Sequence, residues 1–300
     1  MTVPSGMDLR PLTRADIDAV YELGAAYDAV MVREPDIDKA DLEAFWNTPS
    51  FDCERDTRGV FEGEGLLAMA IILKGQHFEI CVHPDRHGCG FGSMLANWAE
   101  GQARAAGLAK GFQSSPRTDR AALAIFAERG YELAWISWVL ELPADVTVPH
   151  RELATGYAVH PYRPGKDERA AHEVIQTAFG EWPDRARSPF EDWRALVLDR
   201  KGFIPEQLLV ATHDAVVVGA AWVVDGESAG WVEALAVDKA HRNRGLAQAL
   251  LATAFEGTRS RGLERAQLAT DTRTGALGLY ERLGMRVSRS YEDWSITLQS

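Results

Sequence analysis

The feature that most constrains the fold of this chain of 300 residues is an internal repeat. The segment EICVHPDRHGCGFGSMLANWAEGQARAAGL (79–108) aligns with EALAVDKAHRNRGLAQALLATAFEGTRSRGL (233–263) when positions about 155 apart are compared. Further along the chain, DRAALAIFAERGYELA (119–134) aligns with RTGALGLYERLGMRVS (273–288). Segments that repeat over this length indicate one structural unit used twice. We therefore expect two tandem domains of the same fold.

Within each half, the spacing of the apolar residues alternates between the periods of strands and helices. In the C-terminal half, three strand-like runs lead into 245–262, where apolar residues recur at helical spacing. MRVSRS (285–290) and DWSITLQ (293–299) are expected to form a final pair of strands. The expected order is β-α-α-β-β-β-α-β-α-β-β. The chain is therefore predicted to have an α/β (α+β) fold with domains at 1–146 and 155–300.

The composition argues against several classes of protein. The longest apolar run, LLAMAIIL (66–73), is too short to cross a bilayer, and MTVPSGMDLR at the start lacks the features of a secretory signal. Cys53, Cys81 and Cys89 form no C-x-x-C pair, which disfavours a disulfide framework and a structural zinc site. We therefore expect a cytoplasmic protein without a metal ion, either a monomer (a pseudo-dimer of its two domains) or a homodimer.

The charge of the chain is acidic and unevenly distributed. The formal net charge is −12, and residues 1–150 carry 13 Lys and Arg against 23 Asp and Glu, whereas residues 151–300 carry 19 against 21. An acidic surface repels the phosphate groups of nucleic acids. We therefore expect neither a nucleic acid nor a membrane as a partner, and such a surface suits solubility or a cationic small molecule.

Against this acidic background, AVDKAHRNRGLAQALLATAF (236–255) places His241, Arg242 and Arg244 immediately before Gly245. The first N–H groups of a helix have no partner within the helix and lie in a positive potential. A basic turn at a helix start can therefore cradle an anion such as a pyrophosphate. The alternative is an ordinary strand-to-helix turn with solvated arginines, and the turn alone does not decide between the two.

This segment resembles the acetyl-CoA signature of the GNAT superfamily of N-acetyltransferases, Q/R-x-x-G-x-G/A after a hydrophobic strand. Arg242, Gly245 and Ala247 match that signature, and GALGLYERLGM (275–285) is similar to the family's late helix, which carries a tyrosine four residues before a glycine. The resemblance covers most of both halves, and no G-x-x-x-x-G-K-[ST] pattern of a Walker P-loop occurs. It implies two tandem GNAT folds, as in the mycothiol synthases, each a mixed, mostly antiparallel central sheet flanked by helices.

The resemblance also implies acetyl-CoA (coenzyme A) as the cofactor. In the C-terminal half it assigns cofactor binding to the strand end, the basic turn and the helix start, which are Leu235, Ala236, Val237, Arg242, Asn243, Arg244, Gly245, Leu246 and Ala247. Arg273 stands where the family often has an asparagine that contacts the pantetheine arm. In the N-terminal half the Gln or Arg of the signature is a histidine, and a weaker second cofactor site is expected at Val82, His87, Gly88, Cys89, Gly90, Phe91 and Gly92.

The implied reaction is direct attack of a primary amine on the thioester of acetyl-CoA. Glu233 is the candidate general base, on the expectation that strand alternation places it on the face of Leu235 and Val237. The alternative is a strand carboxylate that pairs with an arginine. Tyr280 matches the family's general acid toward the departing thiolate, and the alternative is an aromatic residue packed on the core. Because Phe126 replaces this tyrosine in the N-terminal half, we expect a catalytic C-terminal domain and a degenerate N-terminal domain.

The acceptor is expected at FGEWPDRARSPFEDW (179–193), where the resemblance places the acceptor side. Trp182 offers a wall, and Glu181 and Asp184 offer partners for a cationic substrate. Trp193, at helical spacing with apolar neighbours, is expected to pack on the sheet. We therefore predict an acetyl-CoA-dependent N-acetyltransferase acting on a small-molecule amine. The alternatives are a non-catalytic acyl-CoA-binding sensor or scaffold and an acetyltransferase of protein N-termini or lysines.

Overall fold

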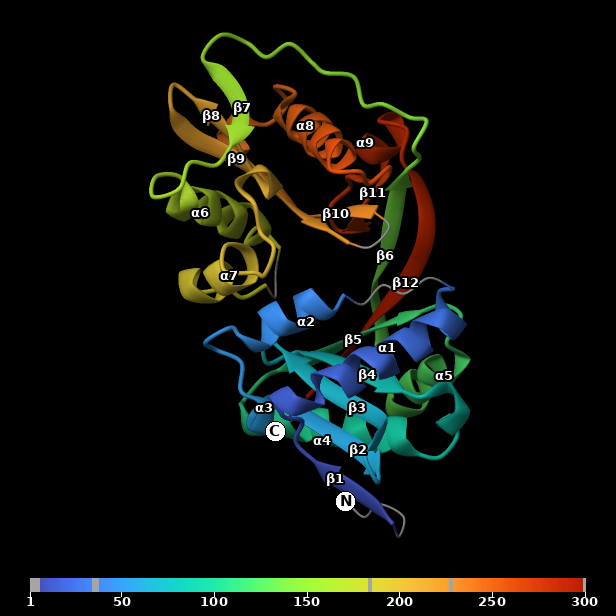
Figure 1. Cartoon of the computed structure of the whole chain (residues 1–300). Coiled ribbons are helices and arrows are strands. Elements are labelled where there is room, and N and C mark those ends of the chain that lie inside the picture. Colours follow the sequence, from blue (N-terminus) through green and yellow to red (C-terminus); the bar gives the residue numbers. More distant parts are fainter. Residues whose placement is uncertain (1–5, 34–37, 183–184, 227–228, 299–300) are drawn as a thin grey trace. The chain divides into compact units, whose positions relative to one another are not determined.

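The computed structural model of the chain describes residues 6–33, 38–182, 185–226 and 229–298 (Figure 1). The chain divides into two compact units. The first consists of Met1–Ser137 with Arg289–Ser300, and the second of Trp138–Ser288. Each unit has a mixed, mostly antiparallel sheet with helices on both faces, which confirms the predicted fold class.

The two units exchange their last strands. β6 (Glu132–Leu142) begins in the first unit and ends in the second, and β12 (Arg286–Thr297) begins in the second and ends in the first. In the first unit, β12 is antiparallel to β5 (Lys110–Pro116). In the second, β6 is the neighbour of β11 (Arg265–Asp271). The predicted boundaries at 1–146 and 155–300 follow the sequence repeat and stay a prediction, whereas the compact units follow these exchanged strands.

The prediction of two strands at 285–290 and 293–299 is wrong, because β12 is one continuous strand. No glycine, proline or asparagine interrupts the sequence between Met285 and Leu298, so nothing in it favours a turn. The register with β5 runs without a shift from Tyr291, opposite Pro116, to Thr297, opposite Lys110.

The first unit places its helices on both faces of a sheet with the order β1-β2-β3-β4-β5-β12. Its other elements are β1 (Met7–Arg10), η1 (Arg14–Asp16), α1 (Ile17–Met31), α2 (Lys39–Trp46), α3 (Cys53–Asp56), β2 (Thr57–Glu62), β3 (Gly65–Leu73), β4 (His77–Val82), η2 (Pro84–Arg86), α4 (Phe91–Ala105) and α5 (Arg120–Arg129). One hydrophobic cluster joins α1 and α2 to the sheet, and another joins α4 to the opposite face. All neighbouring strands among β1–β5 are antiparallel except β4 and β5, which are parallel.

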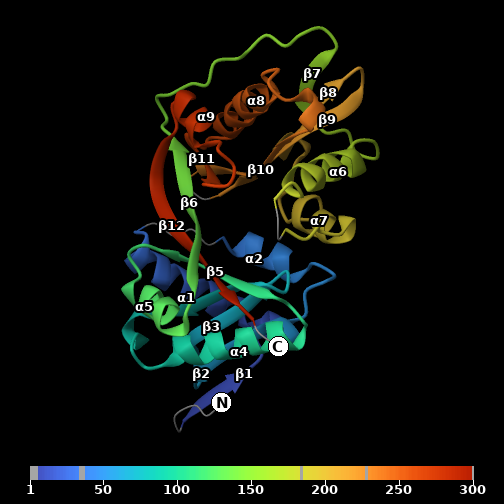
Figure 2. The ribbon, with the colours of Figure 1, turned by 180° about the vertical axis from the view of Figure 1, so that it is seen from behind.

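The second unit repeats this arrangement, with β11, β10, β9, β8 and β7 following β6 in the sheet. Its elements are β7 (Tyr157–Pro161), α6 (Glu168–Phe179), α7 (Phe190–Val197), η3 (Pro205–Gln207), β8 (Leu208–His213), β9 (Val216–Asp225), β10 (Ala229–Val237), η4 (Lys239–His241), α8 (Leu246–Ser260) and α9 (Leu277–Arg282). The two views of the ribbon show α6 and α7 on one face of β8–β10 and α8 on the other (Figures 1 and 2). Trp193, on α7, is buried in the cluster between these helices and the sheet, as predicted.

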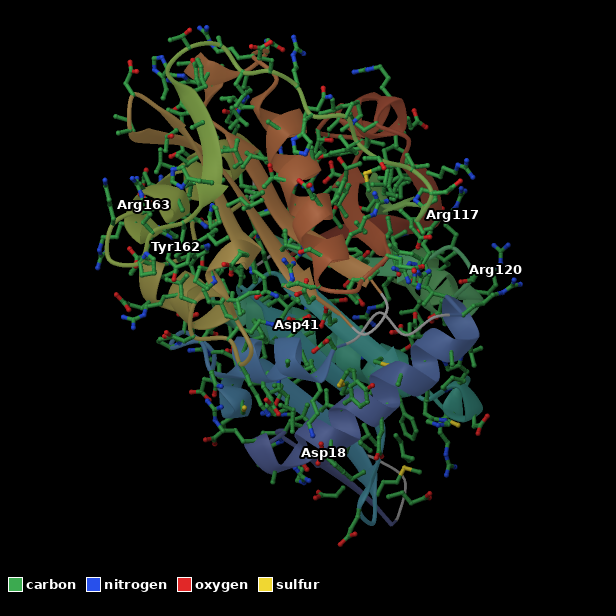
Figure 3. All side chains as sticks on the ribbon, turned by 45° about the horizontal axis from the view of Figure 1, so that its top comes forward. Asp18, Asp41, Arg117, Arg120, Tyr162 and Arg163 are labelled. Atoms are coloured by element: carbon green, nitrogen blue, oxygen red, sulfur yellow. The ribbon has the colours of Figure 1, made fainter. Side chains whose placement is uncertain are left out.

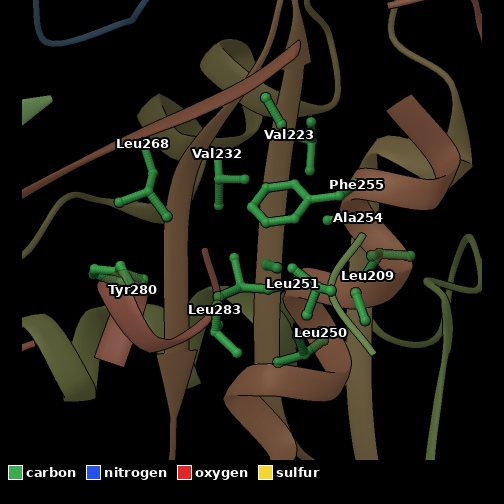
Figure 4. Packing of buried hydrophobic residues seen from close by; sticks show 14 of the residues in the cluster. Leu209, Val223, Val232, Leu250, Leu251, Ala254, Phe255, Leu268, Tyr280 and Leu283 are labelled. Atoms are coloured by element: carbon green, nitrogen blue, oxygen red, sulfur yellow. The ribbon is translucent and has the colours of Figure 1, made fainter. Parts of the chain in front are cut away.

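The helix α8 forms because its apolar residues recur on one face, and that face packs on β8, β9 and β10. Leu250 and Leu251 are fully buried there, with Phe255 one turn further along. They share a hydrophobic cluster with Val232 and Leu268 of the sheet, and Figure 4 shows the Phe255 ring directed toward Val232. The packed helix holds the turn that precedes it against the end of β10. Among the described residues, no helix combines the length and apolarity that a membrane span requires.

Candidate active site

In the second unit, two parallel neighbours in the sheet separate before they end. β10 and β11 pair as far as Val232 and Leu268, yet β10 continues to Val237 and β11 to Asp271. Backbone N–H and C=O groups along the facing edges of diverging strands are able to hydrogen-bond an extended ligand. The sheet therefore contains an opening whose one side is the carboxyl-terminal part of β10.

A β-bulge in β10 lies where this opening begins. Along β9, the register of β10 shifts by one residue between Val232 and Ala234, so Glu233 is the inserted residue. Val232 and Leu235 pack in the cluster under α8, whereas Ala234 packs in the cluster under α6 and α7. The predicted placement of Glu233 on the face of Leu235 and Val237 assumed a regular alternation of side chains, which the bulge interrupts, and that placement stays a prediction. Glu233 itself is exposed.

The basic turn that follows β10 forms a backbone cradle. Asn243 has φ +62° and Gly245 has φ +83°, and α8 begins at the next residue, Leu246. The side chain of Asp238 accepts a hydrogen bond of 2.8 Å from the N–H of Ala240 and holds η4 in place. Such a turn directs successive N–H groups toward one point, and the helix start adds positive potential. The local conformation is therefore suited to an anion.

The first unit has a cradle of the same backbone conformation. Gly88 and Gly90, with φ +80° and +82°, precede α4 in the same way as Asn243 and Gly245 precede α8. His87 Nε2 donates a hydrogen bond of 3.2 Å to the carbonyl of Val82, and the arginine at the equivalent position makes the same contact with β10. The histidine therefore keeps the contact between strand and turn. Phe91 begins α4, and Cys89 is exposed within the turn.

Arg151 lies over the cradle of the second unit, and the sequence prediction missed it. This residue belongs to the linker between β6 and β7 (143–156). A Cβ atom on Gly245 would lie 2.6 Å from Cδ and 3.0 Å from Nε of Arg151, whereas a Cβ on Gly88 or Gly90 would meet no described atom within 4 Å. The linker is held on α8 by a hydrogen bond of 3.1 Å from the helix to the carbonyl of Pro149. A single arginine in a loop carries no motif, so only the folded chain reveals this contact.

The arginine of the signature is paired within the protein. Arg242 donates from both terminal nitrogens to Glu181, at 2.9 and 2.6 Å, and from Nε to the carbonyl of Val237 at 3.0 Å. Hydrogen bonds from Arg242 hold the pKa of the Glu181 carboxyl below its usual range. The sequence assigned Arg242 to the cofactor and Glu181 to a cationic acceptor. The structure joins the two residues, so the charge of each is balanced by the other, and both assignments stay predictions.

Aromatic residues flank the basic turn on the side of β7. The guanidinium carbon of Arg244 lies 5.9 Å from the centre of the Tyr157 ring. The hydroxyl of Tyr157 is hydrogen-bonded to His241 Nδ1 at 2.9 Å, and its ring stacks on His213 with 4.3 Å between centroids. Arg244 therefore remains close to the cradle without a carboxylate in these contacts.

The residues expected on the acceptor side lie next to the end of β11. Arg273 places its guanidinium carbon 5.0 Å from the Trp182 ring centre and donates a hydrogen bond of 2.5 Å to Asp271. Trp182 also packs edge-on against Phe179, the last residue of α6. Asp184, which was predicted as a partner for a cationic substrate, lies outside the described residues.

Tyr280, on α9, lies in the cluster that includes Leu268 and Leu283 (Figure 4). Its side chain is buried, and burial raises the pKa of Tyr280 to about 12. The hydroxyl is therefore protonated throughout the neutral range and is able to act as a proton donor. The two interpretations of this residue, core aromatic and general acid, are compatible in this position.

The equivalent region of the first unit carries different chemistry. Phe126, at the position of Tyr280, is buried against Tyr131 and Trp294. Asp119 replaces Arg273, is buried, and accepts a hydrogen bond of 2.8 Å from the hydroxyl of Tyr27 on α1. The nearby residues Arg117 and Arg120 are exposed, and Figure 3 shows both directed outward. The first unit therefore has a buried carboxylate at the position where the second unit has Arg273.

A further cavity lies away from both cradles. A cavity of about 740 Å³ in the first unit is lined by residues 10–14, Trp46 and 49–55, none of which belongs to either cradle. Its arginines are already engaged, since Arg10 pairs with Asp16, Arg55 pairs with Asp56, and Arg14 donates a hydrogen bond to the carbonyl of Trp46. Among the described residues, no group of three or more His, Cys, Asp and Glu side chains is placed to hold a metal ion.

Comparison with known proteins bears on both units. Residues 168–285 match the model of the Acetyltransferase (GNAT) family. The chain is 30% identical over 229 residues to a mycothiol acetyltransferase of Thermomonospora curvata, covering 75% of each chain. It is 29% identical over 248 residues to a mycothiol acetyltransferase of Thermobispora bispora, covering 75% of this chain and 78% of that protein.

Two solved structures resemble the whole chain. A GCN5-related N-acetyltransferase from Sphaerobacter thermophilus superimposes with a TM-score of 0.77 at 28% identity, over 100% of this chain and 98% of that one. A tandem GNAT protein from the clavulanic acid biosynthesis pathway gives a TM-score of 0.75 at 16% identity, over 98% and 99% of the two chains. The second likeness bears on the fold alone.

Proposed function

Because the chain belongs to the acetyltransferase (GNAT) family, we propose that it transfers the acetyl group of acetyl-CoA to a primary amine of a small molecule. The chain is an acyltransferase of tandem GNAT architecture, and we assign the reaction to its second unit. One observation carries this proposal. The opening between β10 and β11 lies directly beside the cradle at Gly245, so a long ligand with an anionic end fits both features.

The residues present fit coenzyme A. Because Gly245 has no side chain, a pyrophosphate is able to approach the N–H groups of residues 244–247. Arg151 packs directly over this glycine, where a Cβ would collide with it. Arg151 and Arg244 supply positive charge at this point. The facing edge of β10 over residues 235–237 offers backbone groups to the extended pantetheine amides. When bound, acetyl-CoA supplies the activated acetyl thioester.

Residues of the chain are assigned to the three remaining tasks, which are proton removal from the amine, stabilisation of the oxyanion and proton donation to the thiolate. We assign Glu233, exposed on the bulge, as the base that takes a proton from the attacking amine, directly or through water. A backbone N–H of residues 235–237 is assigned to the developing oxyanion. Tyr280, whose pKa is raised by burial, holds the proton that the departing thiolate needs. Arg242 braces the turn through the carbonyl of Val237.

The first unit is assigned a binding role without turnover. Its cradle at Gly88 and Gly90 has the same backbone conformation, which supports a second, weaker coenzyme A site. Phe126 has no proton to give to a thiolate, and its ring is packed between Tyr131 and Trp294. These features favour the sensor or scaffold alternative for this half of the chain only.

A small-molecule acceptor is supported by the relatives, which are named mycothiol acetyltransferases. The test is thiol release from acetyl-CoA measured across a panel of small amines, with coenzyme A binding followed by calorimetry. We expect release with at least one amine and none in its absence. Tight binding of coenzyme A without release by any amine would overturn the proposal in favour of an acyl-CoA-binding protein.

A further inference from the structure

Glu181 and Trp182, in the segment that follows α6, contact residues next to both strands of the opening between β10 and β11. On one side, Glu181 holds Arg242, which precedes the cradle. On the other side, the ring of Trp182 lies against Arg273, which follows β11. An amine that approaches the thioester in this opening therefore passes next to this segment.

Two guanidinium groups lie on the same indole ring of this segment. The guanidinium carbon of Arg185 is 5.3 Å from the Trp182 ring centre and 4.2 Å from the centre of Phe179. The guanidinium carbon of Arg273 is 5.0 Å from the Trp182 ring centre. Cation–π contacts of this kind hold a guanidinium in place without neutralising its charge. The aromatic residues therefore position the guanidinium of Arg185 but leave its positive charge unneutralised.

The charges around this segment leave Arg185 unbalanced. Arg273 pairs with Asp271, and Arg187, two residues further along the same loop, pairs with Glu173 at 2.6 Å. Arg185 forms no ion pair with any residue in the described part of the chain. The packing around its guanidinium and the nearby charge of Arg273 lower the pKa of Arg185 below its usual value. A cation held beside a like charge is stabilised by an anion.

We propose that Arg185 binds a carboxylate of the acceptor, so that the substrate is an amine that also carries a carboxylate, such as an amino acid. This inference rests on the proposed function. One unbalanced guanidinium matches the single charge of a carboxylate better than the double charge of a phosphate, and its planar fork accepts both carboxylate oxygens. A cationic acceptor held by Glu181, as the sequence suggested, conflicts with the engagement of Glu181 by Arg242.

The test measures binding of amines to the full chain saturated with coenzyme A. Calorimetry compares amino acids with their carboxamides, with glycine, phenylalanine and glutamate each paired with the corresponding α-amide, and glucosamine with glucosamine 6-phosphate. In the wild type and in the control Arg187→Gln, at least one amino acid should bind about tenfold or more tightly than its amide, as expected for a charge-assisted hydrogen bond. In Arg185→Gln this preference should vanish while coenzyme A affinity is unchanged.

Several results would overturn the inference. These are equal binding of every acid and its amide, a preference for the phosphate pair alone, equal weakening of both members by Arg185→Gln, and a loss of coenzyme A affinity in that variant. The last outcome would assign Arg185 to the cofactor. If amines cause thiol release but the binding measurements show no preference for a carboxylate, this inference is wrong and the proposed function stands. Carboxylate-selective binding without any thiol release sinks the proposed function alone.

Discussion

Arg242 and Glu181 form a two-pronged ion pair, with N–O distances of 2.9 and 2.6 Å, between the basic turn before α8 and the segment after α6. The pair joins two residues that the sequence assigns to different ligands. Its consequence is that Arg242 is neutralised before any ligand arrives. The charge that meets an anion on the cradle therefore comes from other groups.

The first prediction concerns Glu181→Gln. Removing the carboxylate frees the charge of Arg242 next to the cradle, so coenzyme A should bind a few-fold more tightly, and more so at low salt, where charges are less screened. Calorimetry at two salt concentrations measures this. Glu173→Gln, which removes a carboxylate paired with Arg187 instead, is the control and should leave coenzyme A affinity unchanged. Weaker binding in Glu181→Gln would contradict the prediction.

The second prediction concerns Arg151, the linker residue over Gly245. Arg151→Gln should lower the affinity for coenzyme A by about tenfold at low salt, because a charge-assisted hydrogen bond to phosphate is lost. The neighbouring His150, which pairs with Glu256 at 3.1 Å, provides the control His150→Gln. An affinity that is the same in Arg151→Gln and the wild type would mean that the linker plays no part in cofactor binding.

The third prediction compares the two cradles. Gly245→Val and Gly90→Val each place a side chain at a positive φ, which costs about 1–2 kcal/mol of stability in both. Only the first also collides with Arg151, 2.6 Å from the new Cβ. We expect coenzyme A binding to fall more than tenfold in Gly245→Val and to change little in Gly90→Val. Equal losses would indicate that both cradles hold the cofactor.

The fourth prediction concerns the proton donor. Tyr280→Phe should reduce kcat by about 10²- to 10⁴-fold, the usual contribution of a general acid, with coenzyme A affinity retained. Because no described residue forms a hydrogen bond with this hydroxyl, the thermal stability should change little. Phe126→Tyr is the matched variant in the first unit and should add no activity. Undiminished turnover in Tyr280→Phe would refute the assignment.

The fifth prediction follows from the pKa of Tyr280. Burial raises that pKa to about 12, from 10.0 in the unfolded chain. Below pH 10 both states hold the proton, and between pH 10 and 12 only the unfolded state loses it. The wild type should therefore lose about 1.4 kcal/mol of unfolding free energy per pH unit in this window relative to Tyr280→Phe. Denaturant unfolding of both proteins from pH 9 to 11 measures the difference, and parallel curves would exclude it.

Much of the fold could be predicted from the sequence, because the conformation of a strand, turn or helix depends mainly on residues close to one another in the chain. The strand β10, the turn ending at Gly245 and the helix α8 follow from hydrophobic spacing and from a glycine at positive φ. The repeat of this pattern indicated two copies of one fold before any contact was known. The continuous strand β12 was not recognised, because its two ends lie in different units and its pairing with β5 joins residues about 180 positions apart.

The sequence by itself indicated most strands and helices of the second unit, the positions of the two cradles, and the phenylalanine counterpart of Tyr280. The tertiary structure alone decided which charges meet. Arg151 lies on Gly245, Arg242 holds Glu181, and Arg185 shares Trp182 with Arg273. Backbone conformation depends on adjacent residues, whereas ion pairs and exposed charges depend on which distant segments the packed core brings within a few ångströms of one another.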